Sequence, residues 1–204
     1  METTLNTFSI MFVCTGNMCR SPMAERLAWS LLARRLGPDV ARFRVFSAGT
    51  GTRNGRAMTP EAAAVTSAYG ADPNGFLSSE LTPGHVAAAD LVLTATRAHR
   101  SDVVTVDPVA LRRSFTLTEF ARTSSAVLAS TPPTDLPFDP VERSRALVAA
   151  AARRRGTVRP SRPDEDDIPD PIGRPMEVYQ STGAVIAQAV DATISALVGV
   201  GVRH

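Results

Sequence analysis

Runs of apolar residues along the chain alternate with amphipathic stretches, in the order typical of strands and helices that follow one another. Apolar-rich runs at 8–14 (FSIMFVC), 43–49 (FRVFSAG) and 90–96 (DLVLTAT) predict three buried strands, and a further short strand is expected within 109–121. Strands separated by helices favour a parallel sheet that is covered on both faces. The chain is therefore expected to be an α/β protein, a three-layer αβα fold around a central four-stranded parallel sheet.

In the segments between these runs, apolar residues recur at the spacing of a helix. The segment 22–37 has apolar residues at helical spacing, with Ser21 placed as its N-cap, Pro22 as its first residue and Gly37 as its stop. Further helices are expected at 59–70, from 82 to 89, at 97–104 and at 175–198.

Residues 122–166 have a different character. They hold two proline clusters, one helix expected to begin at Asp139 and Pro140 and to end at Gly156, and then a polar stretch, TVRPSRPDEDD. We predict that residues 1–204 form a single domain and that 122–166 is a partly helical insertion into it. A linker, a lid over the site and a partner surface all remain open as its role.

Composition narrows the class of protein. A chain of 204 residues with 44% hydrophobic content can bury an ordinary core without a disulfide or a metal. The two cysteines, Cys14 and Cys19, make neither a secreted disulfide framework nor a zinc site. The N-terminal stretch has an acidic residue where a signal sequence carries positive charge, and its apolar run is too short for a signal sequence or a membrane span. These features predict a cytoplasmic protein in a reducing compartment, without cofactor, metal or membrane partner.

Charge adds little more. The net charge is +2, and all 22 basic residues are arginine, which suggests the genome composition of a high-GC bacterium. The arginines are scattered and have no interleaved aromatic residues, so nucleic-acid binding is not expected.

The stretch VCTGNMCRSP carries the candidate chemistry. The spacing of Cys14 and Arg20 is weak evidence alone, because an arginine-rich chain produces it often by chance. Its context is stronger, since the turn from the first strand into the first helix lies at the carboxyl edge of the sheet, where ligands bind. Gly16 permits a positive φ and Asn17 tolerates one, so the backbone N–H groups of 15–21 can form an anion-binding nest.

Three side chains would complete a phosphoryl-transfer site. The positive field of the nest favours the thiolate of Cys14 and makes it a nucleophile, and Arg20 can hold two oxygens of a tetrahedral anion. Asp170, between two prolines, is a candidate proton donor for the leaving group, although this stretch taken alone is better explained as an ordinary proline-rich acidic turn. Asp166 or Asp167 could take the same role.

Four motifs occur together and in order: VCTGNMCRSPMAE at 13–25, FSAGT at 46–50, ADLVLTATRAHR at 89–100 and DIPDPIGRPMEVY at 167–179. With them the sequence resembles the low-molecular-weight protein tyrosine phosphatase family over about three quarters of its length. The resemblance implies a phosphatase-type phosphate loop between the first strand and the first helix. It also implies a phosphomonoester hydrolase, most specifically a protein-tyrosine phosphatase, that needs no metal or cofactor.

The resemblance implies roles for individual residues. Cys14 would become a phosphocysteine, Arg20 would bind the phosphoryl oxygens, and Asp170 would act first as general acid and then as general base. The rest of the phosphate-binding loop would be Thr15, Gly16, Asn17, Met18, Cys19 and Ser21.

Supporting roles follow in the same way. Ser21 would hydrogen-bond the Cys14 thiolate, and Asn17 would hold the loop by bonding to Ser21 and Ser47. Cys19 would form a reversible disulfide with Cys14 that protects against over-oxidation, or would be a small buried core thiol.

The departures from the family pattern concern the substrate recess. Positions where phosphotyrosine-specific members carry aromatic residues hold Arg53, Asn54 and Ile172, and Phe76 stands near the place of a common histidine. His99 is expected to be a structural or surface residue. Phosphatase chemistry is thus better supported than phosphotyrosine specificity.

Two alternatives from other classes stay open. An arsenate reductase with a single nucleophilic cysteine and a small-thiol reductant would use a similar loop, and a non-catalytic module would bind phosphate without turning it over. The expected partner is a phosphorylated protein or a small phosphomonoester. The sequence leaves the oligomeric state open.

Overall fold

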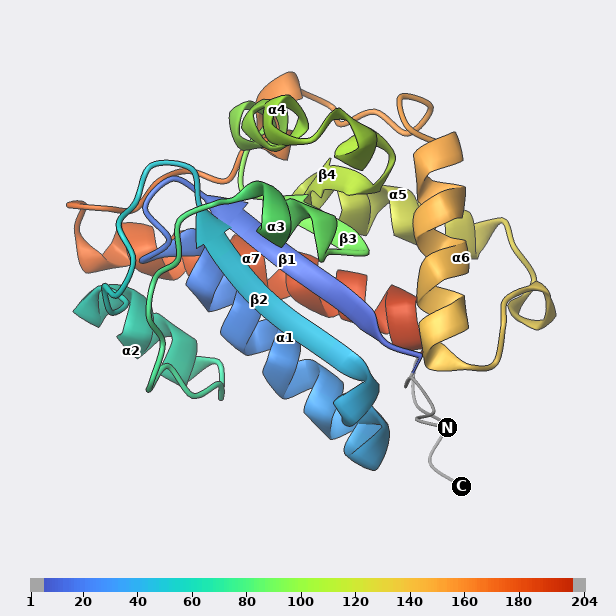
Figure 1. The fold of residues 1–204 in the computed structure, drawn as a ribbon, viewed down its shortest axis with the longest axis horizontal. Coiled ribbons are helices and arrows are strands. Elements are labelled where there is room, and N and C mark those ends of the chain that lie inside the picture. Colours follow the sequence, from blue (N-terminus) through green and yellow to red (C-terminus); the bar gives the residue numbers. More distant parts are fainter. Residues whose placement is uncertain (1–5, 200–204) are drawn as a thin grey trace.

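The computed structural model describes residues 6–199, and its centre is a four-stranded parallel sheet (Figure 1). The strands are β1 (Phe8–Cys14), β2 (Phe43–Gly49), β3 (Leu91–Thr94) and β4 (Ser114–Thr116), in the spatial order β2-β1-β3-β4. The predicted fold class and the positions of all four strands are confirmed.

The central position of β1 in the sheet explains why its sequence is apolar. It pairs with β2 on one side and β3 on the other, and all seven of its residues are buried. Phe8, Ile10 and Phe12 belong to the core on one face of the sheet, whereas Met11 and Val13 belong to the core on the other. A strand covered on both faces has no polar side to display.

Helices cover both faces of the sheet, as Figure 1 shows. The larger core contains side chains of α1 (Arg20–Leu36), α2 (Pro60–Ala68), α5 (Leu117–Ala129), α6 (Pro140–Arg153) and α7 (Met176–Val198). The smaller core contains side chains of α3 (Pro83–Ala87), α4 (Arg97–Val106) and the 3-10 turn η2 (Pro108–Arg113). Three further 3-10 turns are η1 (Gly37–Arg42), η3 (Pro133–Asp135) and η4 (Pro163–Asp166).

Helix α7 is the central helix of the larger core. By length and composition alone it is apolar enough to cross a membrane, and it is the only such helix within residues 6–199. Here it packs against α1, α5, α6 and α2, and Ile186, Val190, Ile194 and Leu197 are fully buried. Its apolar character is therefore accounted for by its place in the core of the fold.

The start of α1 differs from the prediction. The helix begins at Arg20, its N-cap is Cys19, and no side chain caps it, so Ser21 is not the N-cap and Pro22 is not the first residue. The hydroxyl of Ser21 is instead bonded to Cys14 and Asn17. The predicted stop is correct, because Gly37 takes a positive φ of 55°.

Helix α5 crosses the boundary at 122 that the sequence suggested. Thr116 and Glu119 form a capping box at its start, and Phe120 and Val127 are buried in the larger core. Residues up to Ala129 thus belong to the main core. Helix α6 begins where expected, with Asp139 as its N-cap.

Candidate active site

The loop that joins β1 to α1 lies at the carboxyl edge of the sheet. In Figure 1 the arrowheads of β1 and β2 point toward it. Cys14 is the last residue of β1, pairs in register with Gly49 of β2, and is 2% exposed. The loop therefore starts from a fixed position in the sheet, as the sequence predicted.

Hydrogen-bond donors surround the sulfur of Cys14. The hydroxyl of Ser21 lies 3.0 Å from Sγ, and the backbone N–H of Asn17 donates to Sγ over 3.3 Å. Asn17 has a positive φ of 49°, whereas Gly16 does not take a positive φ. The left-handed residue of the loop is thus the asparagine, whose short polar side chain can offset the cost.

The side chain of Asn17 is fully buried and is the hub of the site. Its Nδ2 donates to the hydroxyls of Ser21 and Ser47, each over 2.8 Å, and its Oδ1 accepts from the backbone N–H of Ser79 over 2.8 Å. Because the oxygen of Ser21 already accepts from Asn17, its O–H is left to donate to Cys14. The network therefore presents a hydrogen-bond donor to the sulfur.

The network continues to Glu25, which the sequence did not reveal as a site residue. Ser47 accepts from Asn17 and donates to Oε2 of Glu25 over 2.6 Å. Burial raises the pKa of the Glu25 carboxyl, and the bond from Ser47 and the charge of Arg26 offset this only in part. Glu25 is the last residue of the motif at 13–25, so its place in the first helix was visible in the sequence, but its partner Ser47 on β2 was not.

A Glu25→Gln variant is expected to gain stability relative to the wild type as the pH rises. The folded-state pKa of Glu25 lies above its unfolded value, so the folded wild type holds more protons in this window and its stability falls with rising pH. Glutamine can still accept from Ser47 but carries no charge. The difference in melting temperature, variant minus wild type, should therefore grow from about pH 4 to pH 7. A difference that shrinks over this range would contradict the assignment.

The FSAGT motif holds the loop by its backbone. The N–H of Thr50 donates to the carbonyl of Cys14 over 2.9 Å, and the N–H of Gly51 donates to that of Thr15 over 3.0 Å. A Cβ on Gly49 would lie 2.5 Å from the carbonyl oxygen of Thr15, a distance that no side chain tolerates. Only glycine lets β2 approach the loop this closely.

Arg20 and Asp170 meet across the mouth of the loop although they are 150 residues apart. Nη2 of Arg20 donates to Oδ2 of Asp170 over 2.5 Å, and Nη1 donates to the carbonyl of Ile168 over 3.2 Å. The Arg20 side chain is 6% exposed and that of Asp170 is 42% exposed. The buried Nε of Arg20 has no partner among residues 6–199. The N–H at Nε of Arg20 is thus available to donate to a further acceptor.

The loop that carries Asp170 is attached to the end of β3. The backbone N–H of Ile168 donates to the carbonyl of Ala95 over 2.8 Å, and Asp170 Oδ1 accepts from the N–H of Ile172 over 3.3 Å. The expected proline-braced turn is thus positioned beside the phosphate loop.

The two other carboxylates of this stretch are engaged elsewhere. Asp166 accepts from both Nη atoms of Arg122, over 2.8 and 3.2 Å. Asp167 forms hydrogen bonds with Arg97, which hold the pKa of its carboxyl below the usual range. Asp170 is therefore the acid of this stretch that faces Arg20.

His99 is buried beneath the loop. Its Nε2 lies 2.8 Å from the hydroxyl of Thr15, and its Nδ1 lies 2.7 Å from that of Thr96. Burial lowers the pKa of His99, and the charge of Arg20 lowers it further. The imidazole thus lies between the hydroxyls of Thr15 and Thr96 and connects the loop to the start of α4, which is a structural role.

The recess above Cys14 is small. Its lining residues are Cys14, Gly16, Met18, Cys19, Arg20, Asp170 and Ile172. The expected wall residues Arg53 and Asn54 do not line it: Arg53 is exposed, and Asn54 accepts from the N–H of Glu80 over 2.6 Å. Phe76, in the place of a common histidine, is buried under the guanidinium of Arg26. None of the residues that line this recess is aromatic.

Cys19 lies on the same loop, where it both lines the recess and belongs to the larger core. It is a free thiol, 4% exposed, and its sulfur lies 3.5 Å from the hydroxyl of Thr59. Burial raises the pKa of the Cys19 thiol. Cys14 is also free in this structure, so a disulfide between the two stays a prediction.

No group of three or more histidine, cysteine, aspartate or glutamate side chains within residues 6–199 is placed to hold a metal ion.

Two named proteins are similar to this chain in sequence. Protein-arginine-phosphatase of Geobacillus stearothermophilus is 34% identical over 184 residues, which cover 90% of this chain and 92% of that protein. Low molecular weight protein-tyrosine phosphatase A of Mycobacterium tuberculosis is 44% identical over 92 residues, 44% of this chain and 53% of that protein.

Solved structures show the same fold. The arginine phosphatase YwlE from Geobacillus stearothermophilus aligns with a TM-score of 0.64 and 26% identity, over 92% of this chain and 91% of its own. The Erwinia amylovora tyrosine phosphatase amsI aligns with a TM-score of 0.64 at 19% identity, over 97% and 96%, which supports the fold alone.

The sequence model of one family, low molecular weight phosphotyrosine protein phosphatase, matches residues 9–154. This stretch covers most of the chain and contains the loop with Cys14 and Arg20, together with Asn17, Ser21 and Ser47, whereas Asp170 lies outside it. The chain therefore belongs to the low molecular weight phosphotyrosine protein phosphatase family.

Proposed function

We propose that Cys14, Arg20 and Asp170 carry out the phosphatase reaction typical of this family, and that the substrate is a phosphorylated protein. The observation that carries the proposal is the arrangement at Cys14. Its sulfur accepts from the N–H of Asn17, lies 3.0 Å from the Ser21 hydroxyl, and lines one recess with the Arg20–Asp170 pair.

In the first step the thiolate of Cys14 attacks phosphorus and forms an S–P bond. The bond from phosphorus to the leaving oxygen breaks, and Asp170 gives its proton to that oxygen. Arg20 and the backbone N–H groups of the loop bind the phosphoryl oxygens, on which negative charge is spread.

In the second step water attacks the phosphocysteine. Asp170, now a carboxylate, takes a proton from the water, an O–P bond forms, and the S–P bond breaks. Cys14 leaves as a thiolate, and the O–H of Ser21 donates to it, so the network around Asn17 lowers the cost of the departing charge.

The arsenate reductase alternative is not favoured. The family match and the named relatives are phosphatases. A non-catalytic phosphate-binding module would need neither the buried Cys14 nor the placed carboxylate of Asp170.

Within phosphoproteins, phosphotyrosine is the first candidate substrate because of the family. Phosphoarginine is the second, because the relative that covers 90% of the chain is named for it. The recess favours neither by stacking, since Met18 and the half-exposed Ile172 line it in place of aromatic rings.

A parallel assay with a phosphotyrosine peptide, a phosphoarginine peptide, a small alkyl phosphate, and arsenate with a thiol reductant tests the proposal. We expect one of the two phosphopeptides to be hydrolysed with a kcat/KM at least about tenfold above that of the alkyl phosphate, because an alkoxide is the poorer leaving group and fills less of the recess. Turnover of arsenate alone, or no turnover of any substrate, would contradict the proposal.

We further propose that residues 1–204 act as one catalytic domain in the cytoplasm, with no nucleic-acid or membrane partner. The free thiols of Cys14 and Cys19 suit a reducing compartment. The helices on each face of the sheet pack into one continuous core with that face, which is in keeping with a single domain.

A further inference from the structure

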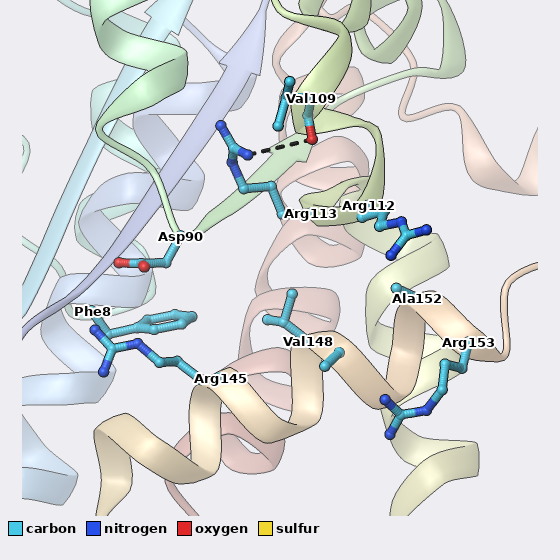
Figure 2. A pocket seen from close by; sticks show the side chains of 10 residues that line it. Phe8, Asp90, Val109, Arg112, Arg113, Arg145, Val148, Ala152 and Arg153 are labelled. Atoms are coloured by element: carbon cyan, nitrogen blue, oxygen red, sulfur yellow. Dashed lines mark hydrogen bonds between the residues drawn. The ribbon is translucent and has the colours of Figure 1, made fainter.

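A second, larger concavity lies at the opposite edge of the sheet from Cys14. It is a groove of about 630 Å³ between η2 and α6, and Figure 2 shows its lining side chains. Phe8, the first residue of β1, and Asp90, directly before β3, close one end of it. Since both strands run from these residues toward the phosphate loop, the groove is remote from the recess of Cys14.

The floor of the groove is apolar. Phe8 and Val148 are almost fully buried and form its base, whereas Val109 on the η2 side is 77% exposed. Ala149 and Ala152 of α6 are small and leave the base open. Beside this buried base, the exposed side chain of Val109 and the small alanines of α6 favour contact with an apolar side chain of a partner.

Arginines rim this floor, and two of them carry charge that no carboxylate balances. Arg112 of η2 and Arg153 of α6 are exposed, and neither forms an ion pair with a carboxylate within residues 6–199. Figure 2 shows both guanidinium groups at the same end of the groove, one on each side. That end of the groove therefore favours a negatively charged group.

The other two arginines are held in place. Arg113 is paired with Asp107 at 3.2 Å, and Arg145 is paired with Glu142 at 3.0 Å and donates to the carbonyl of Thr7 over 2.7 Å. Their charges are partly compensated, so they shape the rim more than they attract an anion.

We propose that this groove docks a short acidic peptide segment of a protein partner, with an apolar side chain over Val148 and carboxylates between Arg112 and Arg153. The groove runs along α6 from Arg145 to Arg153, a helical distance of about 12 Å, which accommodates an extended segment of about four residues. An apolar floor without an exposed aromatic platform suits a peptide rather than a nucleic acid. The proposal assigns a partner surface, and not a lid, to the α6 part of 122–166.

Selection of peptides from a random displayed library against the full chain tests this docking site. We expect the selected sequences to combine Asp or Glu with a neighbouring apolar residue. Affinities of synthetic, fluorescein-labelled copies are then measured by anisotropy. The double variant Arg112→Glu/Arg153→Glu should weaken binding by at least about tenfold, and Val109→Ser should weaken it by a few-fold.

A matched control changes the same charge elsewhere. The double variant Arg34→Glu/Arg44→Glu alters two exposed arginines outside the groove and should bind the peptides as the wild type does. Turnover of an aryl phosphate should be unchanged in all these variants, which separates this site from the catalytic proposal. Equal weakening in both double variants, selected peptides without acidic residues, or preferred binding of an oligonucleotide would overturn the docking site.

Discussion

Replacement of Cys14 by serine is expected to lower kcat for para-nitrophenyl phosphate by at least about 1,000-fold. A serine hydroxyl keeps its proton at neutral pH, and the donors from Asn17 and Ser21 that stabilise a thiolate cannot make an alkoxide of it. The change removes one sulfur from a fully buried position and replaces it with a smaller atom. Steady-state kinetics of the purified variant, with its melting temperature as a check on folding, measure the effect.

Cys19→Ser is the matched control, since it makes the same substitution on the same loop. The sulfur of Cys19 contacts the hydroxyl of Thr59 and packs in the larger core, so its loss should cost stability of about 1 kcal/mol and leave kcat within a few-fold of the wild type. Full activity of Cys14→Ser, or equal loss in both variants, would exclude Cys14 as the nucleophile.

The sequence predicted the fold because its strong signals are local. The apolar run of β1 must be buried on both faces, and the capped start of α2 at Thr59 and Pro60 is visible in the residues themselves. Helix α5 was missed although Thr116 and Glu119 spell a capping box, because the alanines, serines and threonines within it obscure its apolar face.

The residues of the candidate site on the first loop were predictable for the same reason. Cys14, Asn17 and Arg20 lie on one short loop, and their spacing and context are visible together. Asp170 was predictable only as a candidate, and the structure brings it to Arg20 from 150 residues away.

The supporting contacts were not predictable. Ser79 reaches Asn17 through its backbone N–H, which leaves no trace in the identity of its side chain. Glu25 and Ser47 were each in a recognised motif, but their contact depends on how α1 packs against β2. Arg53 and Asn54 were placed at the recess by the order of motifs, whereas the path of their loop turns Asn54 toward Glu80.

The geometry at Arg20 has a consequence for the reaction. Its Nη1 donates to Ile168, its Nη2 donates to Asp170, and its Nε has no partner among residues 6–199. A phosphoryl group that enters the recess therefore competes with Asp170 for the N–H groups of Arg20. The side chain of Asp170 is the exposed member of the pair, and it is the one that can turn toward a leaving group. In the proposed mechanism, anion binding by Arg20 and proton donation by Asp170 are therefore coupled through one ion pair.

The Asp170→Asn variant is expected to show this coupling as a dependence on the leaving group. Asparagine has no proton to give, so kcat for phenyl phosphate, which has a poor leaving group, should fall by about 100-fold or more, whereas kcat for para-nitrophenyl phosphate should fall far less. Asp167→Asn is the matched control, because that carboxylate is held by Arg97 and should affect both substrates equally. The dependence of kcat on the pKa of the leaving phenol, measured over a series of substituted phenyl phosphates, tests this prediction. An equal loss for all members of the series in Asp170→Asn would show that this carboxylate acts only through its ion pair with Arg20 and is not the general acid.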